Sequence, residues 1–376
     1  MTVLPPTAAD GEYFDTPARD LAAHQISLLR RTDVSEPGWY LKFPAGPDKY
    51  AELHMSTSRG DDNKVPEGLR DLVLAIVRDR PLARVTGSPD EMSKPIRRKD
   101  DSVHTAISEQ IEELLAWDRA MRSDAPDSVH QMRVAIRTIR SLLQSSSETF
   151  DLTEDGWVCD ELSELAGALG MARDAEVLAD RYQRALDGLP ENLVRGPILR
   201  RLIDDAQGRY RSGRQASLTV MRSIRYFRLL DALEALVAAD PPAQAPREKK
   251  LAKTAVWDGY KRVRRRVRAA AGAENHDVAL HRIRKSAKRL RYTAAATGAA
   301  KVSEAAKAIQ MLLGDHQDSV VSRANLAEQA DAAHTAGEDT FTYGLLYHLE
   351  TDLAAECESR LRAVLKTLDK AVHKEL

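Results

Sequence analysis

The stretch DSVHQMRVAIRTIR, residues 127–140, decides the fold because it returns later in the chain as DVALHRIRKSAKRLR, residues 277–291. Both copies carry a histidine followed by basic residues three, seven and ten positions later. The first stripe consists of His130, Arg133, Arg137 and Arg140. The second stripe consists of His281, Arg284, Lys288 and Arg291. Apolar residues recur in both copies at three- and four-residue spacing, so each copy is predicted to be an α-helix.

A second pair of matching segments lies downstream of these copies. LGMARD, residues 169–174, matches LGDHQD, residues 313–318. Self-similarity of this kind indicates an internal repeat. We therefore predict a mainly α-helical region over residues 93–376 with two related halves, about 97–235 and 245–376, each a helical bundle.

Each stripe is expected to occupy one narrow side of its helix. At 100° per residue, its four positions fall within about 80° of each other and span about 15 Å. Apolar residues precede the stripe residues by one position, and these are Val129, Met132, Ile136 and Ile139, and Leu280, Ile283, Ala287 and Leu290. Each stripe is thus predicted to follow the edge of a buried face, where packing partly holds the basic side chains.

Stacked like charges favour an anionic partner for the stripes. Basic side chains three or four residues apart repel by a few tenths of a kcal/mol per pair. A bound polyanion would offset this repulsion, and so would carboxylates of neighbouring helices, of which Asp174 and Asp318 are the candidates. The two histidines could be structural hydrogen bonders or donors to an anion, and we assign them no acid–base chemistry.

The near-neutral net charge of −1 conceals a basic region at residues 247–301, which holds 17 Lys+Arg against 4 Asp+Glu. Within it the basic run KRVRRRVR, residues 261–268, has no acid within four residues except Asp258. Its charges are therefore expected to need an external or interdomain partner. The candidate anion-binding residues beyond the stripes are Lys285, Arg289, Arg262, Arg265 and Arg266.

The N-terminal part of the chain has a different sequence pattern from the helical region. Short apolar segments at residues 12–17, 25–31 and 38–44 are bounded by Pro and Gly and predict strands, and residues 66–80 predict a helix. Residues 86–101 are polar and predict a linker. We expect a small α+β domain over residues 1–92 and the helical domain after it.

Several function classes are disfavoured by composition. Cys159 and Cys357 have no second Cys or His at metal-ligand spacing, so no metal site or cofactor is predicted. The N-terminus lacks the pattern of a signal peptide, and no apolar run approaches the ~18 residues of a membrane span. We expect a cytoplasmic protein without a membrane partner.

The paired stripe motifs strongly resemble the CHAD family, the conserved histidine α-helical domain, over about residues 97–373. The resemblance implies two pseudo-symmetric four-helix bundles around a basic channel that binds inorganic polyphosphate, with association to polyphosphate granules in some members. The family's histidine and basic positions fall on the eight stripe residues. Thr138 departs from the pattern, because many members carry a further Arg there.

Residues 13–87 resemble the middle of a CYTH domain, the triphosphate tunnel fold, on the motifs YFDTP (13–17), LRRT (29–32) and GWYLKFP (38–44). The family's opening Glu-x-Glu-x-Lys is absent, and Glu52 is at best what remains of its metal-binding carboxylates. The resemblance therefore implies a partial, catalytically incompetent remnant. Fewer than 90 residues are too few for a closed tunnel, so the segment is expected to pack on the helical domain or on a second copy, and the oligomeric state is left open.

The leading hypothesis is a non-enzymatic polyphosphate-binding protein. Nucleic acid is the alternative ligand for the same charges, although residues 247–301 offer only Trp257, Tyr260 and Tyr292 for base stacking. A residual CYTH-type triphosphatase is the enzymatic alternative, and it would depend on Glu52.

Overall fold

A computed structural model gives the arrangement of the chain, and it divides into two compact units that are described separately. The structure describes residues 11–32, 34–46, 49–56, 64–86, 102–145, 156–238 and 249–375. Unit 1 consists of residues 1–140, 152–169 and 214–241, and unit 2 consists of residues 141–151, 170–213 and 242–376.

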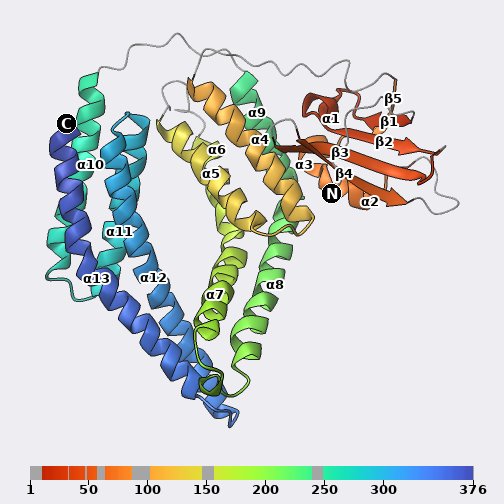
Figure 1. Ribbon diagram of the computed structural model, residues 1–376. Helices are drawn as coiled ribbons and strands as arrows, with labels where there is room; N and C mark the ends of the chain where they lie inside the picture. Colours follow the sequence, from red (N-terminus) through yellow and green to blue (C-terminus); the bar gives the residue numbers. More distant parts are fainter. Residues whose placement is uncertain are drawn as a thin grey trace. The chain divides into compact units, whose positions relative to one another are not determined.

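Unit 1 begins with an antiparallel sheet of strand order β4-β3-β2-β1-β5 (Figure 1). The strands are β1 (Glu12–Asp15), β2 (Ser27–Arg31), β3 (Gly38–Gly46), β4 (Lys49–Ser56) and β5 (Ala83–Val85). The three predicted strands are confirmed, while β4 and β5 were not predicted. Phe14, Leu28 and Leu41 face one another across three strands and are buried, so they form the centre of the sheet's core.

The predicted helix over residues 66–80 is broken into two short helices. These are α2 (Glu67–Leu72) and α3 (Leu74–Val77), and a further short helix, α1 (Asp20–Ala23), follows β1. The break falls at Val73, whose φ of −106° and ψ of 10° depart from helical values. The side chain of Val73 is 1% exposed, so the break leaves it packed in the core.

Two helices of unit 1 pack against this α+β segment, namely α4 (Ser102–Arg122) and α9 (Ile224–Ala238). The unit also holds the part of α5 (Ser128–Ser145) up to Arg140, α6 (Gly156–Ala168) and the end of α8 (Asp205–Val220). Buried Arg78 donates to Asp231 at 2.5 Å and to Glu234 on α9. The predicted linker lies outside the described residues from residue 87 on, so the boundary at residue 92 stays a prediction.

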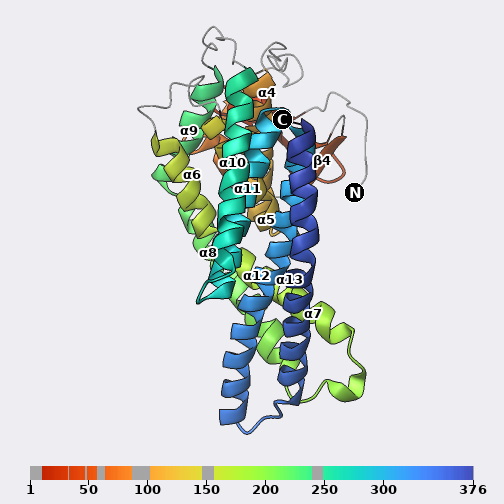
Figure 2. The same cartoon turned by 90° about the vertical axis from the view of Figure 1, so that its left-hand side faces the viewer.

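Unit 2 contains four helices that follow one another side by side (Figure 2). They are α10 (Lys249–Ala270), α11 (His276–Ala296), α12 (Ala300–Thr335) and α13 (Phe341–Glu375). Left-handed glycines make two of the connections, Gly298 with φ of 76° and Gly337 with φ of 72°. Buried side chains of all four helices share one core, among them Val263, Ile283, Ile309 and Leu368.

The two longest helices carry a second core at their far end (Figure 1). There α12 and α13 pack against α7 (Gly170–Asp187) and η3 (Arg200–Asp204). Tyr182, Leu202, Leu326 and Leu346 are among its buried members. Helices α7 and α8 approach closely at Gly213, which has no side chain. An added Cβ there would lie 2.7 Å from the Ala172 nitrogen.

The prediction of a mainly helical protein with a small N-terminal sheet is confirmed. The compact units cut across the predicted halves, because residues 170–213 of the first half join the helices of the second half in unit 2. The two pseudo-symmetric bundles stay a prediction. No helix among the described residues is both long and apolar enough to span a bilayer.

Candidate anion-binding site

Helix α11 fixes the second stripe beside its buried face. The Asn275 side chain caps the helix by accepting a hydrogen bond from the Val278 amide at 3.0 Å. Leu280, Ile283, Ala287 and Leu290 are buried in the core of unit 2. The second-stripe residues His281, Arg284, Lys288 and Arg291 are all half-buried. The predicted placement of this stripe along the edge of a buried face is therefore confirmed.

The second stripe lies against α12. Arg291 donates to the side chain of Gln310 at 3.3 Å, and His281 forms a hydrogen bond with Gln317. The Arg284 guanidinium lies over Gly314, where an added Cβ would be 3.6 Å from both Nε and Nη2. Gly314, the glycine of the repeated LG segment, thus gives the guanidinium room next to the helix backbone.

Two polar atoms of the second stripe are buried without a hydrogen-bond partner among the described residues. They are Nδ1 of His281 and Nε of Arg284, and only the Arg284 nitrogen always carries a proton to donate. A buried donor without a partner costs about 1–3 kcal/mol. A ligand oxygen at this face would remove that cost, so the face is suited to an acceptor-rich ligand.

Burial and neighbouring cations affect the charge of His281. Burial lowers the pKa of its imidazole below 6.5, Lys285 and Arg284 lower it further, and the hydrogen bond with Gln317 raises it. The ring is consequently neutral at pH 7 and carries one N–H. The ring donates that N–H to Gln317, which is why this bond raises the pKa, so His281 adds no charge to a bound anion at pH 7.

An acidic group also lies near the second stripe. Burial raises the pKa of the Asp318 carboxyl, Arg284 and Arg181 lower it, and Asp315 and Asp174 raise it, with a raised pKa as the result. Among the described residues no ion pair within 4.0 Å joins Asp318 to Arg284. Of the two acids predicted to neutralise the stripe, Asp318 is therefore under the electrostatic influence of Arg284 without forming a direct pair, and Asp174 acts on Asp318.

Arg181 of α7 is held by another carboxylate. Its Nε donates to Glu350 Oε1 of α13 at 2.5 Å, and its Nη2 also contacts that carboxylate. Ser322 donates to the same carboxylate at 3.0 Å. Sequence reasoning did not find Arg181, because no local pattern links residue 181 to residue 350.

Helix α5 presents the first stripe in unit 1. Val129, Met132, Ile136 and Ile139 are fully buried, whereas His130, Arg133, Arg137 and Arg140 are half-buried. Nε of Arg140 is buried without an acceptor among the described residues. The Thr138 hydroxyl donates to the Val134 carbonyl of its own helix at 3.0 Å, so the residue that departs from the family pattern is engaged locally. Both stripes thus have the same relation to their helices.

The basic run on α10 is more exposed than the stripes. Val263 anchors it in the core, while Arg262, Arg265 and Arg266 are exposed, as are Lys285 and Arg289 of α11. The expectation that the run needs an external or interdomain partner is wrong for Arg264. Its Nε lies 3.7 Å from Asp369 of α13 in the same unit, because the neighbouring helix supplies an acid that the local sequence does not.

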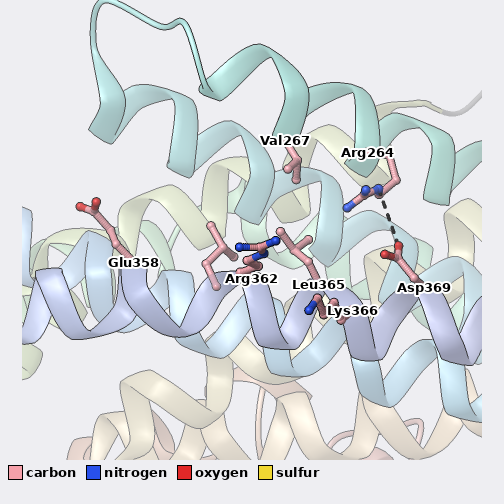
Figure 3. A pocket seen from close by; sticks show the side chains of 8 residues that line it. Arg264, Val267, Glu358, Arg362, Leu365, Lys366 and Asp369 are labelled. Carbon is pink, nitrogen blue, oxygen red and sulfur yellow. Dashed lines mark ion pairs between the residues drawn. The ribbon is translucent and has the colours of Figure 1, made fainter.

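A groove of about 470 Å³ lies between α10 and α13 (Figure 3). Its floor is apolar, with Val267, Leu361 and Leu365, and its sides carry charges of both signs, including the Arg264–Asp369 pair. None of the thirteen predicted residues lines it. The groove is therefore separate from the second stripe.

The part of the chain that the structure describes contains no group of three or more His, Cys, Asp or Glu residues that could hold a metal ion. Glu52 lies exposed on β4 opposite Lys42 of β3.

Comparisons with known proteins place this geometry in context. The sequence profile of the CHAD domain matches residues 105–327. Two uncharacterized proteins of Mycobacterium tuberculosis, from strains CDC 1551 and H37Rv, are 46% identical over 472 aligned positions, which cover 98% of this chain and 91% of theirs. That alignment is longer than the 376-residue chain, so these relatives carry segments without a counterpart here.

Two solved structures share the fold. The crystal structure of the CHAD domain from the plant Ricinus communis has a TM-score of 0.52 and 25% identity, and the match covers 70% of this chain and 90% of that chain. PptA from Streptomyces chartreusis also has a TM-score of 0.52, with 20% identity over 72% of this chain and 97% of that chain. The latter likeness concerns the fold alone.

Proposed function

The chain belongs to the CHAD family, and from that premise we propose that it binds inorganic polyphosphate through its two basic stripes, without catalysing a reaction. The observation that carries the proposal is the second stripe, with half-buried cations along α11, the Arg284 guanidinium over Gly314 and a buried Arg284 Nε that lacks an acceptor among the described residues. A chain of linked phosphates supplies many charged oxygens in a row. Each can accept from a guanidinium, often through two parallel hydrogen bonds.

Partial burial supports a linear ligand at this face. Packing along the edge of the core restricts the basic side chains, so less rotamer entropy is lost when they bind. The stripe extends about 15 Å along α11, which suits several consecutive phosphates better than a single anion. The first stripe has the same design and offers a second stretch of contacts.

The remaining parts of the proposal follow the family resemblance. We propose that the sheet of unit 1 is a remnant of a CYTH domain without triphosphatase activity. In the same proposal the protein acts in the cytoplasm and joins polyphosphate granules where these form. Magnesium-dependent phosphate release from triphosphate, lost in Glu52→Gln, would contradict the non-catalytic part.

A competition titration tests the ligand. Labelled long-chain polyphosphate is bound to the full chain at physiological salt and challenged with unlabelled polyphosphate, triphosphate, single-stranded DNA and duplex DNA. We expect only long-chain polyphosphate to displace the label efficiently. Equal displacement by DNA would mean that the stripes are a general polyanion surface, and the proposed ligand would be wrong.

A charge-reversal variant tests the site. The double change Arg133→Glu and Arg284→Glu removes one cation from each stripe, and we expect it to abolish most of the affinity with unchanged helicity by circular dichroism. The matched control, Arg70→Glu with Arg184→Glu, reverses one exposed arginine in each unit and should keep most of the affinity. If the variant with Arg133→Glu and Arg284→Glu binds like the wild type, the stripes are not the binding site.

A further inference from the structure

Asp318 is a carboxylate that the polyphosphate site does not require. It lies on α12 one turn after Gly314, the residue beneath the Arg284 guanidinium, and its side chain is half-buried. A carboxylate next to a site for a polyanion repels the ligand. Its presence there therefore needs a physical reason.

The charged groups that act on Asp318 come from three helices. They are Arg284 on α11, Asp315 on α12, and Arg181 and Asp174 on α7. Two more groups contact their neighbours, because His281 of α11 bonds to Gln317 and Glu350 of α13 pairs with Arg181. Arg181 is occupied by Glu350, whereas Arg284 has no ion pair of its own among the described residues. Arg284 is thus the cation with the largest effect on the Asp318 carboxyl.

The repeat supplies a second carboxylate whose charge acts on Asp318. Asp174 and Asp318 occupy matching positions of the two LG segments, and both act on the same electrostatic environment in unit 2. Their mutual repulsion makes a second negative charge at Asp318 costly. A proton on Asp318 relieves that cost.

We propose that Asp318 is the internal counter-anion of the second stripe, and that it takes up a proton from solvent when polyphosphate binds. This inference rests on the proposed function. When polyphosphate binds, its oxygens balance the charge of Arg284 in place of the Asp318 carboxylate, and they add negative charge near that carboxylate. The Asp318 carboxylate then accepts one proton on an oxygen and becomes a neutral carboxylic acid, so binding is coupled to pH.

The direction of the pH dependence follows from the charges. Burial has already raised the pKa of Asp318, and a bound polyanion raises it further. The complex therefore holds more protons than the free protein, and affinity increases as the pH falls. His281 contributes in the same direction below pH 6.5, so the experiment has to separate the two groups.

The isosteric change Asp318→Asn tests the inference. Calorimetric titration with long-chain polyphosphate in two buffers of different ionisation enthalpy measures the protons taken up at pH 6. We expect uptake by the wild type and a clear reduction in Asp318→Asn. At pH 7.5 the variant should bind about fivefold more tightly, in the range expected for one half-exposed charge.

Two further variants isolate Asp318. His281→Gln should keep the uptake that depends on Asp318, and Asp318→Asn with His281→Gln should lose nearly all of it. Asp331→Asn, which removes an exposed charge farther along α12, should bind like the wild type.

Each outcome has a distinct meaning. If the wild type binds and Asp318→Asn binds more weakly with an intact fold by circular dichroism, Asp318 positions Arg284 and the counter-anion proposal is wrong. Unchanged affinity and unchanged proton uptake would also overturn it. Failure of the wild type to bind polyphosphate would instead contradict the proposed function itself.

Discussion

The second stripe on α11 and the basic run on the neighbouring α10 have similar charge but differ in how that charge is held. The stripe side chains are half-buried and lie against α12, with Arg284 over Gly314. In the run, Arg262, Arg265 and Arg266 extend into solvent. Exposed cations lose conformational entropy when they order around a ligand, and salt screens them. The comparison indicates that charge density in a sequence does not by itself make a structured binding site.

Removing one cation from each region gives the largest expected difference. Arg284→Ala should weaken polyphosphate binding about 10- to 100-fold, since charge-assisted hydrogen bonds contribute about 1.5–3 kcal/mol. Arg265→Ala should weaken it less than about threefold, as expected for an exposed charge. The titration described above measures both. Equal losses would mean that the run and the stripe bind alike, and the distinction drawn here would fail.

Changing the surface beneath the stripe should give an intermediate effect. Gly314→Leu would displace the Arg284 guanidinium and should weaken polyphosphate binding about three- to tenfold. The control Gly344→Leu adds a side chain in open space on α13 and should leave binding unchanged. Gly314→Ala adds a Cβ at ordinary contact distance, 3.6 Å from Arg284, and should raise the melting temperature because alanine favours the helix. Loss of stability in Gly314→Ala would show that the assigned clearance is wrong.

The histidine of the stripe should have the smallest effect. Because burial lowers the pKa of His281, His281→Gln should change affinity little at pH 7.5. As the pH falls through and below 6.5, the wild-type ring gains a charge and its affinity should rise more steeply than that of the variant. Affinities measured from pH 5 to 8 test this. Parallel curves for the two proteins would mean that His281 does not titrate in the site.

Local patterns predicted the elements that depend on local periodicity. The alternation of apolar and basic residues in 277–291 predicted both the buried face of α11 and the half-buried stripe beside it. Strand β4 was missed because KYAELHMS, residues 49–56, contains several helix-favouring residues and no β-branched ones. It is a strand because it pairs with β3, with Leu53 opposite Leu41. Pairing between separate segments decides such cases.

Long-range ion pairs were missed for the same reason. The local sequence left Arg264 without a counter-charge, yet Asp369 lies beside it in the folded chain. Arg181 likewise finds Glu350, 169 residues later in the sequence. Spacing within a helix reports which residues share a face, but it carries no information about the helix that covers that face.

The second core of unit 2 has a consequence for how the protein is made. Tyr182 of α7 packs with Leu326 of α12 and Leu346 of α13, which the ribosome adds roughly 150 residues later. At about 5–20 residues per second, the apolar side of α7 waits about 10–30 s for its partners. The apolar side of α7 therefore stays available to chaperones until α12 and the first turns of α13 have been made.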